Sequence, residues 1–157
     1  MWNMTFVIQL ITSLISAAAF ALIFHLRVRY LPWAAIGGGG TFLLYYIIDT
    51  AFSSVFAAAL LASAFSAIFS EVCARIKQAP AVIFLLPCAI PIVPGGALYR
   101  TMMHLISKRY DLAFHYLGQT VAIAIGIAGG IAAVSLIVHL INESTKQLRE
   151  WKAKKKT

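Results

Sequence analysis

Charged residues are scarce in this chain, because Asp, Glu, Lys and Arg together make up 11% of its 157 residues while hydrophobic residues make up 61%. Soluble domains carry roughly 25% charged residues, so this chain has too little charge to cover a water-facing surface. A disordered chain is excluded for the opposite reason, because disorder requires low hydrophobicity. The composition predicts an all-α, polytopic integral membrane protein, and the length allows one domain.

The residue patterns of enzymes and metal sites are also missing. Cys73 and Cys88 form no CxxC pair, and no His or Asp is spaced to complete a metal site with them. The run from Gly37 to Gly40 lacks the Lys-Ser/Thr pair of a phosphate-binding loop. His25, His115 and His139 stand singly, without a nucleophile beside them. We therefore expect no catalysis, no metal and no cofactor.

Five apolar segments are long enough, or nearly so, to cross a bilayer core of roughly 30 Å as helices. They lie at about residues 4–24, 33–48, 51–70, 79–107 and 117–141, and they form a transmembrane domain over residues 1–142. The second segment is short, and we interpret its four glycines as close packing or a local helix break. The fourth is broken at Pro94-Gly95-Gly96. Whether these two segments cross the bilayer completely is left open.

The basic residues predict an orientation, since cytoplasmic connections are enriched in Lys and Arg. Arg27 and Arg29 follow the first segment, and Arg75 and Lys77 follow the third. The polar tail, residues 143–157, carries six more: Lys146, Arg149, Lys152, Lys154, Lys155 and Lys156. Five crossings then place the N-terminus outside and the tail in the cytoplasm. This distribution of the net charge of +8 suits anionic lipid and not nucleic acid.

One basic stretch disagrees with that topology. Arg100, Lys108 and Arg109 fall where the topology expects an external connection. We therefore expect residues 97–110 to continue the fourth segment as a second half-helix. In such a helix Arg100, His104 and Lys108 recur every four residues and share one face.

The break itself is the candidate binding site. Irregular backbone at membrane depth is tolerated only where protein or a water-filled cavity surrounds it, and transporters bind solutes at the free N–H groups of half-helices. The predicted site, suited to a carboxylate, comprises Pro94, Gly95, Gly96, Tyr99, Arg100 and His104. The alternative is a proline kink with Arg100 reaching to the interface as an anchor.

Two further features are weaker. Small residues recur every four positions and predict helix-packing or partner-contact faces at Ala58, Ala62, Ser66, Gly118, Gly126 and Gly130. Asp49 lies between two apolar runs, where we favour a role as the N-cap of the third helix. Proton or ion coupling through Asp49 is the minority interpretation.

The run Ile90-Pro-Ile-Val-Pro94-Gly95-Gly96-Ala-Leu-Tyr99-Arg100, preceded by Pro80-Ala-Val, resembles the threonine/serine exporter family. The likeness is to the C-terminal half of the exporter, which also occurs as a separate small subunit. It implies export of threonine and serine driven by the proton motive force, in the cytoplasmic membrane of a prokaryote. It also implies a larger partner subunit and a small carboxylate-bearing solute. Two alternatives stay open, namely a subunit of a dicarboxylate (succinate) exporter and a non-transporting membrane scaffold.

Overall fold

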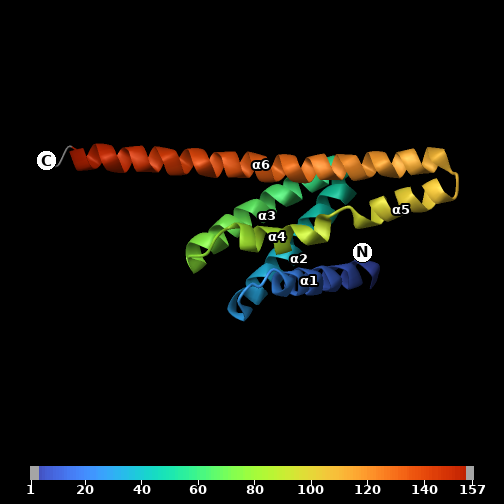
Figure 1. Ribbon diagram of the computed structural model, residues 1–157, viewed down its shortest axis with the longest axis horizontal. Coiled ribbons are helices and arrows are strands. Elements are labelled where there is room, and N and C mark those ends of the chain that lie inside the picture. Colours follow the sequence, from blue (N-terminus) through green and yellow to red (C-terminus); the bar gives the residue numbers. More distant parts are fainter. Residues whose placement is uncertain (1–3, 155–157) are drawn as a thin grey trace.

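The computed structural model describes residues 4–154, with side chains for residues 4–144. Over that range the regular elements are all helices, and they occur in the following order (Figure 1): α1 (Met4–Ile23), η1 (Val28–Tyr30), α2 (Leu31–Phe52), α3 (Val55–Lys77), α4 (Val82–Ala89), η2 (Ile90–Ile92), α5 (Gly95–Ile106) and α6 (Tyr110–Lys154).

Four stretches are long and apolar enough to cross a membrane: α1, η1 with α2, α3, and the first part of α6. The segments Val82–Ile92 and Gly95–Ile106 pass the same test together and are bent by 48° at their junction. If this bent pair is one span, the bundle has five. The prediction of an all-α membrane bundle with a broken fourth segment is therefore confirmed.

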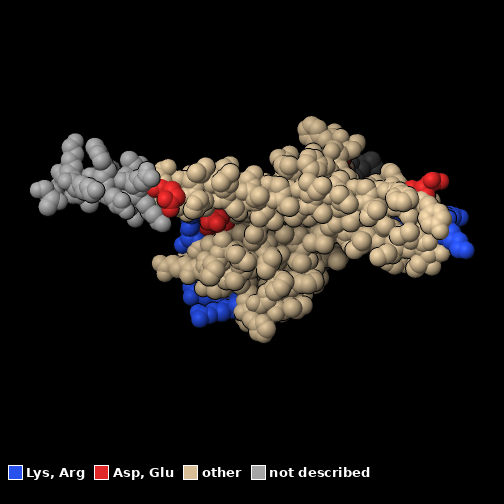
Figure 2. All heavy atoms as spheres, turned by 45° about the horizontal axis from the view of Figure 1, so that its top comes forward, with Lys and Arg blue, Asp and Glu red and all other residues tan. Residues whose placement is uncertain are grey.

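On the face that Figure 2 shows, Lys, Arg, Asp and Glu side chains gather toward the two ends of the described part of the molecule, and the surface between them is mostly uncharged. The α1–α2 and α3–α4 connections lie at one end, and the α5–α6 turn lies at the other (Figure 1). The first end carries Arg27, Arg29, Arg75 and Lys77, and the turn carries Lys108, Arg109 and Asp111. An uncharged belt between charged ends is what a bilayer-spanning bundle requires.

The glycine run does not break its helix. α2 is continuous over 22 residues, so the predicted bounds of 33–48 were too short and the alternative of a helix break is wrong. A Cβ on any of the four glycines would collide with or crowd a neighbouring helix. The neighbours are Cys88 and Phe69 at Gly37, Ala17 at Gly38, Leu14 at Gly39 and Phe65 at Gly40. The glycines therefore let α1, α3 and α4 approach the α2 backbone closely.

The predicted N-cap role of Asp49 is also wrong. Asp49 lies in the last turn of α2, and its carbonyl accepts the N–H of Ser53 at 2.9 Å. The cap of α3 is Ser54, whose side-chain oxygen accepts the N–H of Ala57 at 3.4 Å. Because the cap lies at Ser54, α3 runs over Val55–Lys77 and not over the predicted 51–70.

α3 is packed tightly against α6 through two of the predicted glycines. A Cβ on Gly126 would lie 2.9 Å from the carbonyl oxygen of Phe56, and one on Gly130 would collide with Ser63 and Leu60. Ala58, Ala62 and Ser66 are fully buried on α3. Gly118 differs, since it is exposed and a Cβ there would meet nothing within 4 Å.

α6 is much longer than a bilayer crossing. Its 45 residues correspond to about 67 Å at roughly 1.5 Å per residue. It runs past the rest of the bundle toward the C-terminus (Figure 1) and continues without interruption through the predicted boundary between residues 142 and 143. The side chains of the six basic tail residues lie outside the described ones.

We predict that Gly130→Leu destabilises the bundle, because the added side chain must force α6 away from α3. Overpacking of this kind costs roughly 1–3 kcal/mol. Gly118→Leu is the matched control on the same helix and should leave stability unchanged. Thermal unfolding of the purified protein in detergent measures both variants, and equal midpoints would contradict the packing of α3 against α6.

The topology predicts that single cysteines at Ser107 and Ser144 are labelled from opposite sides of the membrane. Both positions are exposed, one at the α5–α6 turn and one toward the far end of α6. The background would carry Cys73→Ala and Cys88→Ala, whose thiols are buried. Labelling of both positions by an impermeant maleimide from one side would overturn the five-crossing topology.

Candidate functional site at the helix break

Proline divides the fourth segment into two helices. Pro91 and Pro94 have no N–H, so a helix cannot continue through them with its hydrogen bonds intact. The chain instead passes through the short 3₁₀ turn η2 to Val93, which is extended, as the residue before a proline prefers to be. Pro94 is the N-cap of α5, and the new helix starts at Gly95.

Two backbone donors are free at the start of α5. The N–H of Gly95 donates to the Val93 carbonyl at 2.7 Å, and the N–H of Leu98 donates to the Pro94 carbonyl at 3.0 Å. Between them, the N–H groups of Gly96 and Ala97 have no acceptor in the part of the chain that the structure describes. Free N–H groups at a helix start carry partial positive charge and attract anions.

A hollow of about 300 Å³ lies at this break. α2, α3, η2, α5 and α6 all contribute to its wall, with the residues Phe42, Tyr45, Val55, Pro91, Ile92, Val93, Pro94, Gly96, Ala97, Arg100, Tyr116, Gln119 and Ile123. Arg100 is the one cationic side chain among these described residues, and none of them is acidic. Arg100 is therefore the group of this lining that suits a single carboxylate.

Tyr116 of α6 holds the basic face of α5. The guanidinium carbon of Arg100 lies 5.5 Å from the centre of the Tyr116 ring, and the His104 ring stacks on the same ring at 5.4 Å with 7° between the planes. A cation over an aromatic ring is attracted by about 0.5–1 kcal/mol at an exposed site. Arg100 makes no ion pair within the described residues, so its charge remains available to a ligand.

The predicted stripe of three basic residues is only partly correct. α5 ends at Ile106, and Lys108 lies in the following turn with a φ of 56°. Arg100 and His104 therefore share a face while Lys108 does not belong to it.

Residues 9–137, which are most of the chain, match the family described as "Threonine/Serine exporter, ThrE". This chain belongs to the threonine/serine exporter family. No curated protein and no solved structure gave a match. The family is a transporter family and not a class of enzymes.

In this exporter the predicted site residues divide into two groups. Pro94, Gly96 and Arg100 line the hollow, and His104 is joined to it through Tyr116. Gly95 and Tyr99 do not line it, and the Tyr99 side chain is 69% exposed. Asp49 lies one turn beyond Tyr45 on α2, also outside the lining.

Sequence reasoning missed three polar members of the exporter's hollow, namely Tyr45, Tyr116 and Gln119. Gln119 carried a signal, because it is a polar residue within an apolar run and lies three residues after Tyr116 on the same helix. The Nε2 atoms of Gln119 and His115 are 3.2 Å apart, which leaves the amide oxygen of Gln119 as an acceptor. Tyr45 could not be assigned without knowing how α2 packs.

We predict that Gly96→Ala leaves the stability of the exporter unchanged. A Cβ there would meet nothing within 4 Å, and the backbone does not have a positive φ. The change in unfolding free energy should stay below about 0.5 kcal/mol, whereas Gly38→Ala, which collides with Ala17, should destabilise clearly. Thermal unfolding compares the two, and equal losses would show that Gly96 is required for packing.

Proposed function

We propose that this chain is the small subunit of a two-component secondary transporter that exports threonine and serine across the cytoplasmic membrane of a prokaryote. The proton motive force drives the export, the N-terminus lies outside and the C-terminus lies in the cytoplasm. One observation carries the proposal, namely the placement of Arg100 beside the free N–H groups of Gly96 and Ala97 at the break.

The chemistry of the hollow supports an amino acid as the solute. Arg100 offers a planar set of donors to a carboxylate, and the N–H groups of Gly96 and Ala97 add two more. The Tyr45 hydroxyl and the amide oxygen of Gln119 are acceptors for an ammonium group and, in the case of threonine and serine, for a hydroxyl. Because the lining has one cationic side chain, it favours a solute with one carboxylate over the dicarboxylate succinate.

A larger subunit is proposed because the site lies on the surface of this chain. Arg100 and Gly96 are exposed, and the buried polar side chains within the described residues are Ser and Thr only. Each of these hydroxyls donates to a backbone carbonyl near it on its own helix. The described part of the chain therefore has no charged or free polar path through its interior, and a solute route needs a second wall.

The exposed apolar side chains of the α5–α6 hairpin are suited to contact the larger subunit that would form the second wall. Ile106 is 84% exposed and Phe114 is 69% exposed, and Leu98, Met102 and Met103 are exposed beside them. Gly118, where an added Cβ would meet nothing within 4 Å among the described residues, lies on the same hairpin and is available for close packing of a partner helix. Lipid covers the apolar surface that the partner leaves.

The test is efflux of labelled threonine, serine and succinate from loaded cells. The chain would be expressed alone, with the larger subunit, and with that subunit plus Arg100→Ala. We expect efflux of threonine and serine only when both subunits are present, and a loss of roughly tenfold or more in Arg100→Ala, because a charged hydrogen bond is removed. Arg109→Ala, which removes a charge in the α5–α6 turn, is the matched control and should retain efflux.

The other outcomes distinguish the alternatives. Efflux of succinate in place of the amino acids would indicate the dicarboxylate exporter. No solute-dependent difference in any combination, with both proteins shown to be inserted, would favour the membrane scaffold. Full efflux with Arg100→Ala would contradict the site assignment while leaving the transporter proposal standing.

A further inference from the structure

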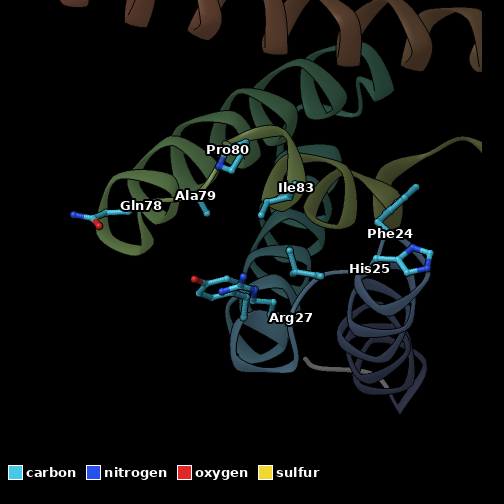
Figure 3. Close-up of a pocket in the computed structure, with 9 residues that line it drawn as sticks. Phe24, His25, Arg27, Gln78, Ala79, Pro80 and Ile83 are labelled. Carbon is cyan, nitrogen blue, oxygen red and sulfur yellow. The ribbon is translucent and has the colours of Figure 1, made fainter.

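A second hollow, of about 320 Å³, lies at the opposite end of the molecule from the α5–α6 turn (Figure 1). It opens between the α1–α2 connection and the α3–α4 connection, and its lining residues are Phe24, His25, Leu26, Arg27, Tyr30, Gln78, Ala79, Pro80 and Ile83 (Figure 3). Figure 3 shows Arg27 on one side of it and Ala79, Pro80 and Ile83 on the other, while the Gln78 side chain points outward. None of the lining residues is acidic.

The walls of this hollow are fixed by packing. Both connections carry a residue in the left-handed region, His25 with a φ of 57° and Gln78 with a φ of 51°, which is uncommon for residues other than glycine. Leu26 is buried against Ala21 and Ala34, with Tyr30 and Ile83 packed beside them. Tyr30 joins the two connections, because its ring meets Phe84 edge-on at 5.6 Å and its hydroxyl donates to the Lys77 carbonyl at 3.5 Å.

The basic residues at this end are not equivalent. The Lys77 ammonium lies over the Trp33 ring at 4.5 Å, and Arg75 donates to the side chain of Asn142 at 3.2 Å. Arg27 and Arg29 have no ion pair or side-chain hydrogen bond to any residue whose side chain is described. Of these two, only Arg27 lines the hollow. The hollow therefore contains an arginine that makes no ion pair with the described side chains.

The surroundings place the hollow at the level of lipid headgroups. It lies at the end of the bundle where four basic residues gather. Tyr30 is part of its lining, and Trp33 lies at the same end, in contact with Lys77. Trp and Tyr are enriched at the membrane–water interface, and basic residues collect on the cytoplasmic side, where anionic lipids are found. The guanidinium group of arginine matches phosphate oxygens in geometry and charge.

We propose that this hollow binds a phosphate-bearing anion, with Arg27 as its cationic contact. Two sources offer that chemistry, the headgroup of an anionic phospholipid and free phosphate. The apolar wall formed by Leu26, Pro80 and Ile83 favours the phospholipid, because it would cover the first part of an acyl chain. The site is separate from the helix break and does not depend on the proposed transport.

The test measures lipid binding to the purified full chain in detergent micelles by native mass spectrometry. The probes are phosphatidylglycerol, which is anionic, and phosphatidylcholine, which carries the same phosphate without net charge. We expect the chain to bind phosphatidylglycerol about tenfold more tightly than phosphatidylcholine. Arg27→Gln should abolish that preference. Arg29→Gln removes the same charge from the same connection outside the hollow, and it should change the affinity less than twofold.

A second variant separates the contribution of the hollow to lipid binding from the contribution of the Arg27 charge. Ala79→Leu fills the hollow and keeps Arg27, so we expect it to weaken phosphatidylglycerol binding by about tenfold. Both Arg27 and Ala79 lie at the surface of connections, and thermal unfolding checks that each variant is folded.

Competition with inorganic phosphate identifies the source of the anion. Phosphatidylglycerol binding that persists in a large excess of inorganic phosphate supports the lipid. Displacement by phosphate, with the same dependence on Arg27, supports free phosphate at the same site. Equal binding of the two lipids, or equal effects of Arg27→Gln and Arg29→Gln, would overturn the proposal.

Discussion

The close approach of α3 to α2 and α6 is the interaction on which the rest of the structure depends. In a bilayer the lipid tails are as apolar as the side chains, so burial of apolar surface contributes little to holding helices together. Close van der Waals contact must do this instead. Gly37 and Gly40 of α2 accept phenylalanine rings of α3, and Gly126 and Gly130 of α6 accept its backbone. α3 is thereby packed on both sides, and α2, α3 and α6 form a rigid frame. Because this frame is held by close packing, the broken segment of α4 and α5 can lie against it without itself being a regular helix.

The frame of α2, α3 and α6 determines how much of the helix break is shielded from lipid. Proline ends α4 and leaves the N–H groups of Gly96 and Ala97 unpaired at the start of α5, an arrangement that lipid would not tolerate without other cover. α2, α3 and α6 shield part of this region from lipid, since residues of all three helices line the hollow at the break. Tyr116 holds Arg100 over the same region. The side of the hollow that these helices do not line is open, and we propose that a solute and a second subunit occupy it.

Much of the fold could be predicted from the sequence, because membrane composition leaves few alternatives. The positions of the five segments and the break at Pro94 follow from hydrophobic runs and from the covalent geometry of proline. The errors arose where a local rule competed with packing. The glycine run left close packing and a helix break open, because glycine destabilises isolated helices. The structure shows a continuous helix whose glycines lie against neighbouring side chains. Asp49 was a plausible cap, yet Ser54 caps α3.

The site was predictable only in part, for a related reason. Arg100 and Pro94 can be recognised in the sequence, because Arg100 is a charged residue and Pro94 a helix-breaking residue within an apolar segment. Tyr45 and Tyr116 look like ordinary aromatic residues until α2 and α6 are placed beside the break. The predicted roles of Gly118, Gly126 and Gly130 were indistinguishable in the sequence, since all three belong to one repeating pattern. The packing separates them, because two face α3 and Gly118 faces open space.

The central claim is that solute binds at the start of α5 in a site completed by a second subunit. The most direct measurement is the rate at which an impermeant thiol reagent modifies a Gly96→Cys variant lacking Cys73 and Cys88. The account predicts fast modification in the chain alone, slower modification with the larger subunit, and a further decrease when threonine or serine is added to the complex. A rate that is the same in all three conditions would contradict it.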